Sequence, residues 1–396
     1  MKSTARLLLT LCSLLLVAGC STAPALPPMP PAQDLFADGA FRKPATPVSA
    51  DELFRLDPSM QAYLRSAYFT SALRKHGAER GLVEALYQKG ELQLEYDADA
   101  TRNAADTFAE KKGNCLALVI MTAAFAKELK LNFDFQNVLV DEQWSRSSNM
   151  YLASTHVNLR FTVRGEHLRS YDTSRHTLTV DFMPPKDAAS LRTRVIDEAR
   201  IVAMYLNNRA VEEMSAHRTD AAYWWARAAI VKDPSYITAY NTLGVVYQRH
   251  GDFSLAERVY WRALERERED TIVMHNLVPV LARLGKTEES VALAARLKTL
   301  QPSPPFYYFD KGMKAIETGR YADAKGFFER EVARSPFYHE FHFWLAIAHW
   351  RLGESRAARE RLSMAVDTST SANATKIYLG KLDYLRSLTA LGRKAY

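Results

Sequence analysis

The chain has 396 residues, 47% of them hydrophobic and 24% charged, which is enough to bury the cores of two domains. Its formal net charge at pH 7 is +7. The basic residues are mixed with acidic ones, and no basic patch with interleaved aromatic residues stands out. We therefore do not expect nucleic acid as a partner.

The N-terminus predicts an export signal over residues 1–19. Lys2 and Arg6 give it a positive start, and the apolar run over 7–17 is too short to span a bilayer. Two small residues then precede Cys20. This stretch resembles the lipobox of bacterial lipoproteins. The resemblance implies that lipid is attached to Cys20 and anchors the protein in the outer membrane, facing the periplasm.

The next stretch, residues 20–50, contains seven prolines. A stretch of this composition cannot build a core, so it predicts an extended tether between the lipid and the folded domains. After it, no apolar run is long enough to predict a transmembrane helix.

The first half of the remaining chain predicts an α+β domain over residues 51–200. Two helices are expected between 51 and 90, and a third over 101–110. An apolar helix is expected from Cys115 to about residue 130. Three β-rich runs follow it, over 133–140, 155–163 and 177–182.

Three residues of this half stand out as a possible catalytic triad. Cys115 follows Gly-Asn at the start of the apolar helix, where unpaired backbone N–H groups favour a thiolate. His156 lies at the start of the middle β-rich run, and Asp181 lies near the end of the last one.

The order of a helix-borne Cys, a strand-borne His and a strand-end Asp resembles the transglutaminase-like cysteine fold, the α+β class that also contains papain-type peptidases. The resemblance covers about residues 90–186. It implies that Cys115 is the nucleophile, that His156 transfers the proton and that Asp181 orients the imidazole.

Several assignments stay open at this point. Asp172 competes with Asp181 for the third position, since both lie at distances from the histidine that suit a hairpin. The backbone N–H of Cys115 can supply one oxyanion donor, and Gln136 and Trp144 are possible second donors. Cys115 could also be a structural residue, because free cysteine is among the most buried residue types.

The second half of the chain is a repeat array with a period of 34 residues. Mostly small residues recur where two helices must pack closely, at Ala210, Gly244, Val278, Gly312 and Ala346. A companion set follows twelve residues later, at Ala222, Ala256, Ser290, Ala324 and Ala358. This pattern resembles the tetratricopeptide (TPR) repeat, whose period is also 34.

The resemblance implies an all-α solenoid of five units over residues 203–372, closed by a capping helix over 373–396. The third unit departs from the pattern with Val278 and Ser290 at its small positions. The concave groove of such a solenoid binds a protein or peptide, and Tyr240 and Tyr247 are candidate contacts.

Two functions of different classes follow from these patterns. In the first, the protein is an envelope amide hydrolase or acyl transferase whose repeats bring substrate or partner. In the second, the transglutaminase-like domain is silent and the protein is a lipid-anchored adaptor. No cofactor is expected, because no P-loop or dinucleotide fingerprint is present. His339, His342 and His349 lack the spacing of a helix-borne metal site and are expected either to pack within the array or to lie on its surface.

Overall fold

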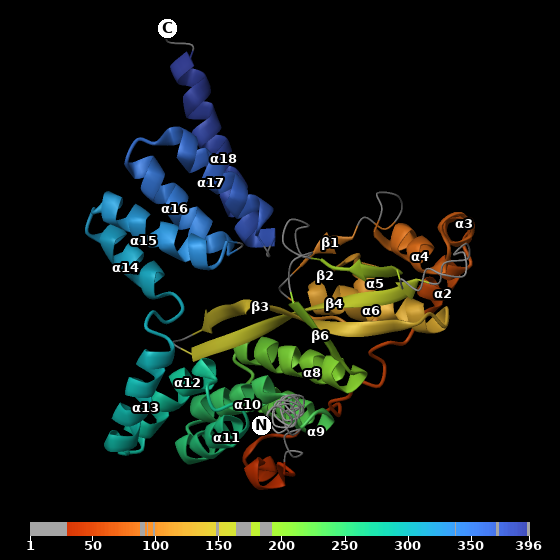
Figure 1. The fold of residues 1–396 in the computed structure, drawn as a ribbon, viewed down its shortest axis with the longest axis horizontal. Coiled ribbons are helices and arrows are strands. Elements are labelled where there is room, and N and C mark those ends of the chain that lie inside the picture. Colours follow the sequence, from red (N-terminus) through yellow and green to blue (C-terminus); the bar gives the residue numbers. More distant parts are fainter. Residues whose placement is uncertain are drawn as a thin grey trace, which may run out of the picture. The chain divides into compact units, whose positions relative to one another are not determined.

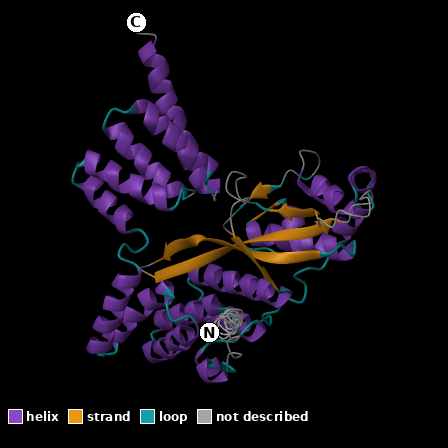
Figure 2. Cartoon of the chain, viewed as in Figure 1, coloured by secondary structure: helices purple, strands orange, loops and turns teal. Residues whose placement is uncertain are grey.

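The computed structural model describes residues 30–87, 92, 94–97, 100–147, 150–163, 176–182, 192–336, 338–369 and 372–393. The expected export signal, Cys20 and Asp172 lie outside these residues. Figure 2 shows that the strands gather in one region and that the remaining elements are helical. None of the described helices has an apolar stretch long enough to cross a bilayer.

The α+β part combines short helices with a four-stranded sheet (Figure 1). Its helices are α2 (Pro58–Leu64), α3 (Ala67–His76), α4 (Ala78–Tyr87), α5 (Ala104–Glu110) and α6 (Cys115–Glu128). The sheet has the order β5-β4-β3-β6, with β3 (Phe133–Ser147), β4 (Met150–Val163), β5 (His176–Val180) and β6 (Arg192–Ile196) all antiparallel to their neighbours. A separate parallel pair joins β1 (Glu95–Tyr96) to β2 (Lys112–Gly113).

The expectation of two helices between residues 51 and 90 is wrong, because the first of them is divided. Asp57 caps the N-terminus of α2 by accepting from the Met60 N–H. Ser66 then caps α3 by accepting from the Phe69 N–H, which starts a new helix after a single turn residue. Serine is among the preferred N-cap residues, and this local hydrogen bond outweighs the continuous apolar pattern.

Helix α6 forms the centre of the α+β core. Every residue from Leu116 to Ala126 is buried, as expected of a helix that is apolar on all sides. It packs against β4 on the sheet and against α4 and α5. The Phe125 ring lies 6.1 Å from Phe69 and 5.7 Å from Phe108, so aromatic packing holds the C-terminal half of α6 in place.

The second half of the chain consists of paired helices. They are α8 (Glu198–Ser215), α9 (Thr219–Lys232), α10 (Ile237–His250), α11 (Phe253–Arg266), α12 (Thr271–Arg283), α13 (Thr287–Leu300), α14 (Tyr307–Glu317), α15 (Tyr321–Arg334), α16 (His339–Arg351), α17 (Ser355–Asp367) and α18 (Ala372–Arg393). Each helix packs against the next from α8 to α13, and again from α14 to α18. Few contacts join α13 to α14, where three prolines lie between residues 302 and 305.

The small positions of the repeat are sites of close helix packing. A Cβ added at Gly244 would lie 2.4 Å from the Tyr260 ring, and one added at Gly312 would lie 2.5 Å from the Phe328 ring. In each pair the ring stands sixteen residues after the glycine. The third unit reverses the sizes, with Val278 at the first position and Ala294 sixteen residues later. Its departure from the pattern is therefore a volume-conserving exchange.

Gly244→Ala is expected to lower the free energy of unfolding by about 1–3 kcal/mol, because the methyl group forces Tyr260 out of a filled site. Gly326→Ala in α15 is the matched control, since nothing lies within 4 Å of its added Cβ. We expect that control to be neutral or to stabilise by up to ~1 kcal/mol. Urea unfolding followed by circular dichroism measures both, and equal effects would contradict the packing argument.

Residues 33–42 fold back onto the repeat helices, and we call them the N-terminal clamp. Leu35 and Phe41 are 1% and 4% exposed. The Phe41 ring stacks on Tyr223 of α9 with 4.0 Å between ring centroids. The Tyr247 hydroxyl of α10 donates to the Leu35 carbonyl over 2.7 Å. For these residues the expected extended tether is wrong.

Charged and polar contacts complete the clamp. Asp38 accepts from the Tyr223 hydroxyl at 2.6 Å and from Arg227 Nε at 2.8 Å. Asp34 pairs with Arg262 of α11 at 3.1 Å. The proline-rich composition hides this interface, because the two apolar residues that anchor it lie between the two proline clusters of the expected tether.

Candidate active site

Cys115 is the first residue of α6, and its neighbours fix that helix start. The Asn114 side chain caps the helix by accepting from the Ala117 N–H at 2.9 Å. Gly113 is needed before it, because an added Cβ would lie 2.9 Å from the Ala117 Cβ and 3.2 Å from Thr107. Cys115 itself is half-buried and forms no disulfide. Its position at the N-terminus of a fourteen-residue helix favours negative charge on sulfur.

The sheet brings His156 and Asp181 together. His156 lies on β4, and Asp181 follows directly after β5, which pairs with β4 through Leu159 and Val180. The His156 Nε2–H donates to Asp181 Oδ1 over 2.6 Å. Both side chains are buried, at 6% and 8% exposure. Of the two aspartates considered for this place, Asp181 contacts the histidine and Asp172 lies outside the described residues.

The Cys115 thiol contacts the same imidazole. Burial alone would lower the pKa of His156, but hydrogen bonds to Asp181 and to Cys115, with the negative charges of both, raise it to about 9. Since Nε2 is occupied by the carboxylate, Nδ1 is the nitrogen left for the thiol. The structure thus brings Cys115, His156 and Asp181 into one continuous chain of contacts, in which a protonated imidazole lies between two acidic groups.

Asn158 is a member of this site that the sequence analysis missed. Its Nδ2 donates to Asp181 Oδ2 over 2.8 Å, so both carboxylate oxygens are held. It is only 2% exposed. Asn158 lies two residues after His156 on β4, and alternate residues of a strand share one face. The alternation in His-Val-Asn could therefore have placed Asn158 on the same face of the strand as His156.

Of the two possible second oxyanion donors, the structure describes the side chain of Gln136, which has a partner elsewhere. Gln136 is 3% exposed, and its amide donates to Thr193 Oγ1 on β6 over 3.0 Å. This amide therefore forms a hydrogen bond within the sheet and is not directed to an oxyanion. Trp144 lies in β3 opposite Ala153, and its side chain is outside the described part of the structure. The β3–β4 register shifts just beyond the pair formed by Val138 and His156. Such irregularities are common beside active sites.

The tyrosines expected in the partner groove are not available to a partner. Tyr240 and Tyr247 are both 0% exposed. Tyr240 donates to the Pro234 carbonyl over 3.0 Å, and Tyr247 holds the N-terminal clamp. In addition, β4 packs against α10 and α12, which are the first helices of the second and third units. With the contacts of α6 and β3 on α8, other parts of the chain thus lie against the first helix of each of the first three units.

The three histidines of the fifth unit have protein partners. His339 bonds to the Tyr378 hydroxyl at 2.8 Å, His342 to the Pro336 carbonyl at 2.7 Å and His349 to Glu354 at 2.5 Å. Among the described residues, no group of three or more potential metal ligands comes together.

Comparisons with known proteins concern the repeat half. A family model described as "Tetratricopeptide repeat" matches residues 309–373. The solved structure of YrrB, titled a TPR protein with an unusual peptide-binding site, is 21% identical with a TM-score of 0.25, covering 46% of this chain and 92% of that one. That of Pseudomonas aeruginosa pilF is 20% identical with a TM-score of 0.28, covering 49% and 90%. A search of the curated proteins gives no match.

The chain therefore contains TPR repeats in its C-terminal region, arranged as a helical solenoid. The matched residues begin in α14 and run through α17 into the start of α18. Repeats of this kind present surfaces that suit protein or peptide partners.

Proposed function

We propose that the α+β domain is a transglutaminase-like cysteine enzyme that cleaves or transfers an acyl group at an amide bond. The observation that carries the proposal is the contact chain from Cys115 through His156 to Asp181. A thiol at a helix N-terminus and an imidazole oriented by a buried carboxylate are the parts that nucleophilic thiol catalysis needs. Asn158 in turn holds that carboxylate.

The reaction follows from these roles. The Cys115 thiolate adds to the amide carbonyl carbon, the C–N bond breaks, and the proton of His156 passes to the leaving amine. A thioester remains on Cys115. Water or a second amine then adds to the thioester, its proton returns to His156, and the C–S bond breaks. The backbone N–H of Cys115 is suited to bind the oxyanion.

p-Nitrophenyl acetate tests this proposal without knowledge of the natural substrate. The wild type should release a burst of one equivalent of p-nitrophenol as Cys115 is acetylated, and Cys115→Ala should show none. Ethanolamine should accelerate the second phase if the enzyme transfers acyl groups to amines. Acetylation of Cys115 at the rate of an ordinary thiol would reject catalysis and favour an adaptor with a silent domain.

The partner of the repeats is proposed to bind at α16–α18. A groove of about 590 Å³ lies there, lined by apolar residues of the three helices and by Lys376 and Lys381. Trp350 and Tyr384 on its walls are 39% and 56% exposed. None of its described lining residues is acidic, which suits an apolar peptide with acidic flanks. A Glu-flanked amphipathic peptide should bind more tightly than its Lys-flanked twin, and Lys376→Glu with Lys381→Glu should reverse that order.

We further propose that Cys20 carries lipid and that the protein is anchored in the outer membrane and faces the periplasm. The lipobox resemblance of residues 16–20 supports this. Labelling with palmitate in the wild type, absent in Cys20→Ala, tests it.

A further inference from the structure

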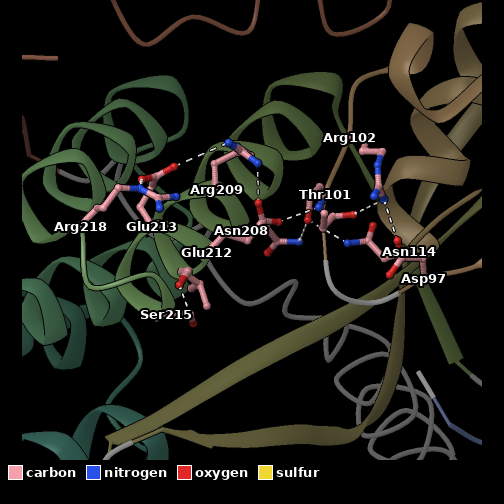
Figure 3. A network of polar contacts seen from close by, with 12 residues as sticks. Asp97, Thr101, Arg102, Asn114, Asn208, Arg209, Glu212, Glu213, Ser215 and Arg218 are labelled. Carbon is pink, nitrogen blue, oxygen red and sulfur yellow. Dashed lines mark hydrogen bonds and ion pairs between the residues drawn. The ribbon is translucent and has the colours of Figure 1, made fainter. Parts of the chain in front are cut away.

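A buried hydroxyl joins the start of α6 to the first repeat helix (Figure 3). Thr101 precedes α5 and is 3% exposed. Its Oγ1 accepts from Asn114 Nδ2 at 2.8 Å and from Asn208 Nδ2 of α8 at 3.2 Å. Its backbone N–H donates to Glu212 Oε1 of α8 over 2.6 Å. The residue before the candidate nucleophile and two residues of the repeat array thus share one partner.

The hydrogen-bonding capacity of Thr101 is fully used. A hydroxyl has one hydrogen to donate and two lone pairs to accept with. Asn114 and Asn208 occupy the two lone pairs of the hydroxyl. The hydroxyl hydrogen is left for the Glu212 carboxylate, which therefore bonds to the side chain of Thr101 as well as to its backbone N–H. Arg209 pairs with Glu212 at 2.5 Å and supplies the compensating charge. A largely satisfied network of this kind favours one arrangement.

This arrangement decides which way the Asn114 amide faces. Because Nδ2 is held by Thr101, Oδ1 is turned to the Ala117 N–H and caps α6. A rotated amide would place NH₂ against an N–H donor and lose both bonds. Cys115 is the next residue in the chain, so the cap sets the backbone from which its thiol projects.

We propose that Thr101 and Glu212 are positioning residues for Cys115, through which the first repeat helix sets the geometry of the nucleophile. The catalytic part of this statement rests on the proposed function, whereas the link between α8 and the α6 cap does not. A consequence is that a partner that displaces α8 changes the reactivity of the thiol.

Hydrogen exchange of the first turn of α6 and alkylation of Cys115 by iodoacetamide together test the inference. Thr101→Val and Glu212→Ala should speed exchange at the Ala117 amide at least tenfold and change the alkylation rate at least threefold. Glu212→Gln should restore both, since its amide oxygen can still accept from the Thr101 N–H.

Glu198→Ala is the matched control. It removes another contact between the same two helices, the 2.5 Å pair of Glu198 with Lys127, but leaves the cap untouched. If Glu212→Ala behaves like Glu198→Ala in both measurements, the inference is overturned. If exchange responds as expected while the wild-type thiol reacts like an ordinary cysteine, the positioning of α6 by α8 stands and the proposed catalysis fails.

Discussion

His156→Ala is expected to slow the alkylation of Cys115 by iodoacetamide roughly 30-fold at pH 7, because a thiol without an imidazolium partner is only about 3% ionised there. In the wild type the imidazole contacts the Cys115 thiol and is itself held by Asp181. Alkylation rates measured from pH 4 to 10 in the native protein and in His156→Ala give the comparison directly.

The pH dependence of that difference has a defined sign. The pKa of His156 is raised to about 9, so the imidazolium persists through neutral pH and is lost as the pH passes that value. The two proteins should therefore differ most near and below neutral pH and converge above pH 9. His76→Ala, an exposed histidine at the end of α3, is the control and should match the wild type throughout. Indifference of the rate to His156 at every pH would mean that Cys115 is structural.

Phe41→Ala is expected to cost about 3–5 kcal/mol, the usual range for removing a buried phenylalanine ring. The ring is 4% exposed, stacks on Tyr223 and also lies 5.8 Å from the Tyr247 ring. Its loss leaves a cavity between α9 and α10, and the N-terminal clamp should detach. Denaturant unfolding followed by tryptophan fluorescence measures the free energy, because Trp224 donates to the Arg42 carbonyl at the edge of the clamp.

Phe36→Ala provides the comparison within the same segment. Phe36 is half-buried, and the Arg227 guanidinium lies 4.7 Å from the centroid of its ring. We expect a loss below about 1 kcal/mol for this change. Similar losses for Phe36→Ala and Phe41→Ala would show that the clamp is not anchored by the Phe41 pocket.

The repeat helices and the start of α6 were predictable because their signals are local. A 34-residue recurrence of small residues and a Gly-Asn-Cys helix start depend on backbone packing and capping within a few residues. The contact between His156 and Asp181 was anticipated only through resemblance, since nothing in the spacing distinguishes Asp181 from Asp172. The structure adds the reason for the contact, which is the pairing of β4 with β5.

The features that could not be predicted are contacts between distant segments. Leu35 and Tyr247 are 212 residues apart, and Thr101 and Glu212 are 111 apart. No periodicity links such partners, because each bond depends on the final placement of whole elements. Asn158 is different, since the strand alternation beside His156 could have revealed it.

The N-terminal clamp has a consequence for where the protein can work. With the lipid proposed on Cys20, only the stretch from residue 20 to residue 33 remains to span the distance to the membrane. Thirteen residues extend at most about 45 Å, against about 100 Å for the whole stretch to residue 50. The repeat helices that hold the clamp would then stay close to the lipid surface. Large soluble assemblies far from the membrane would lie beyond reach, and membrane-bound or membrane-apposed partners would be favoured by proximity alone.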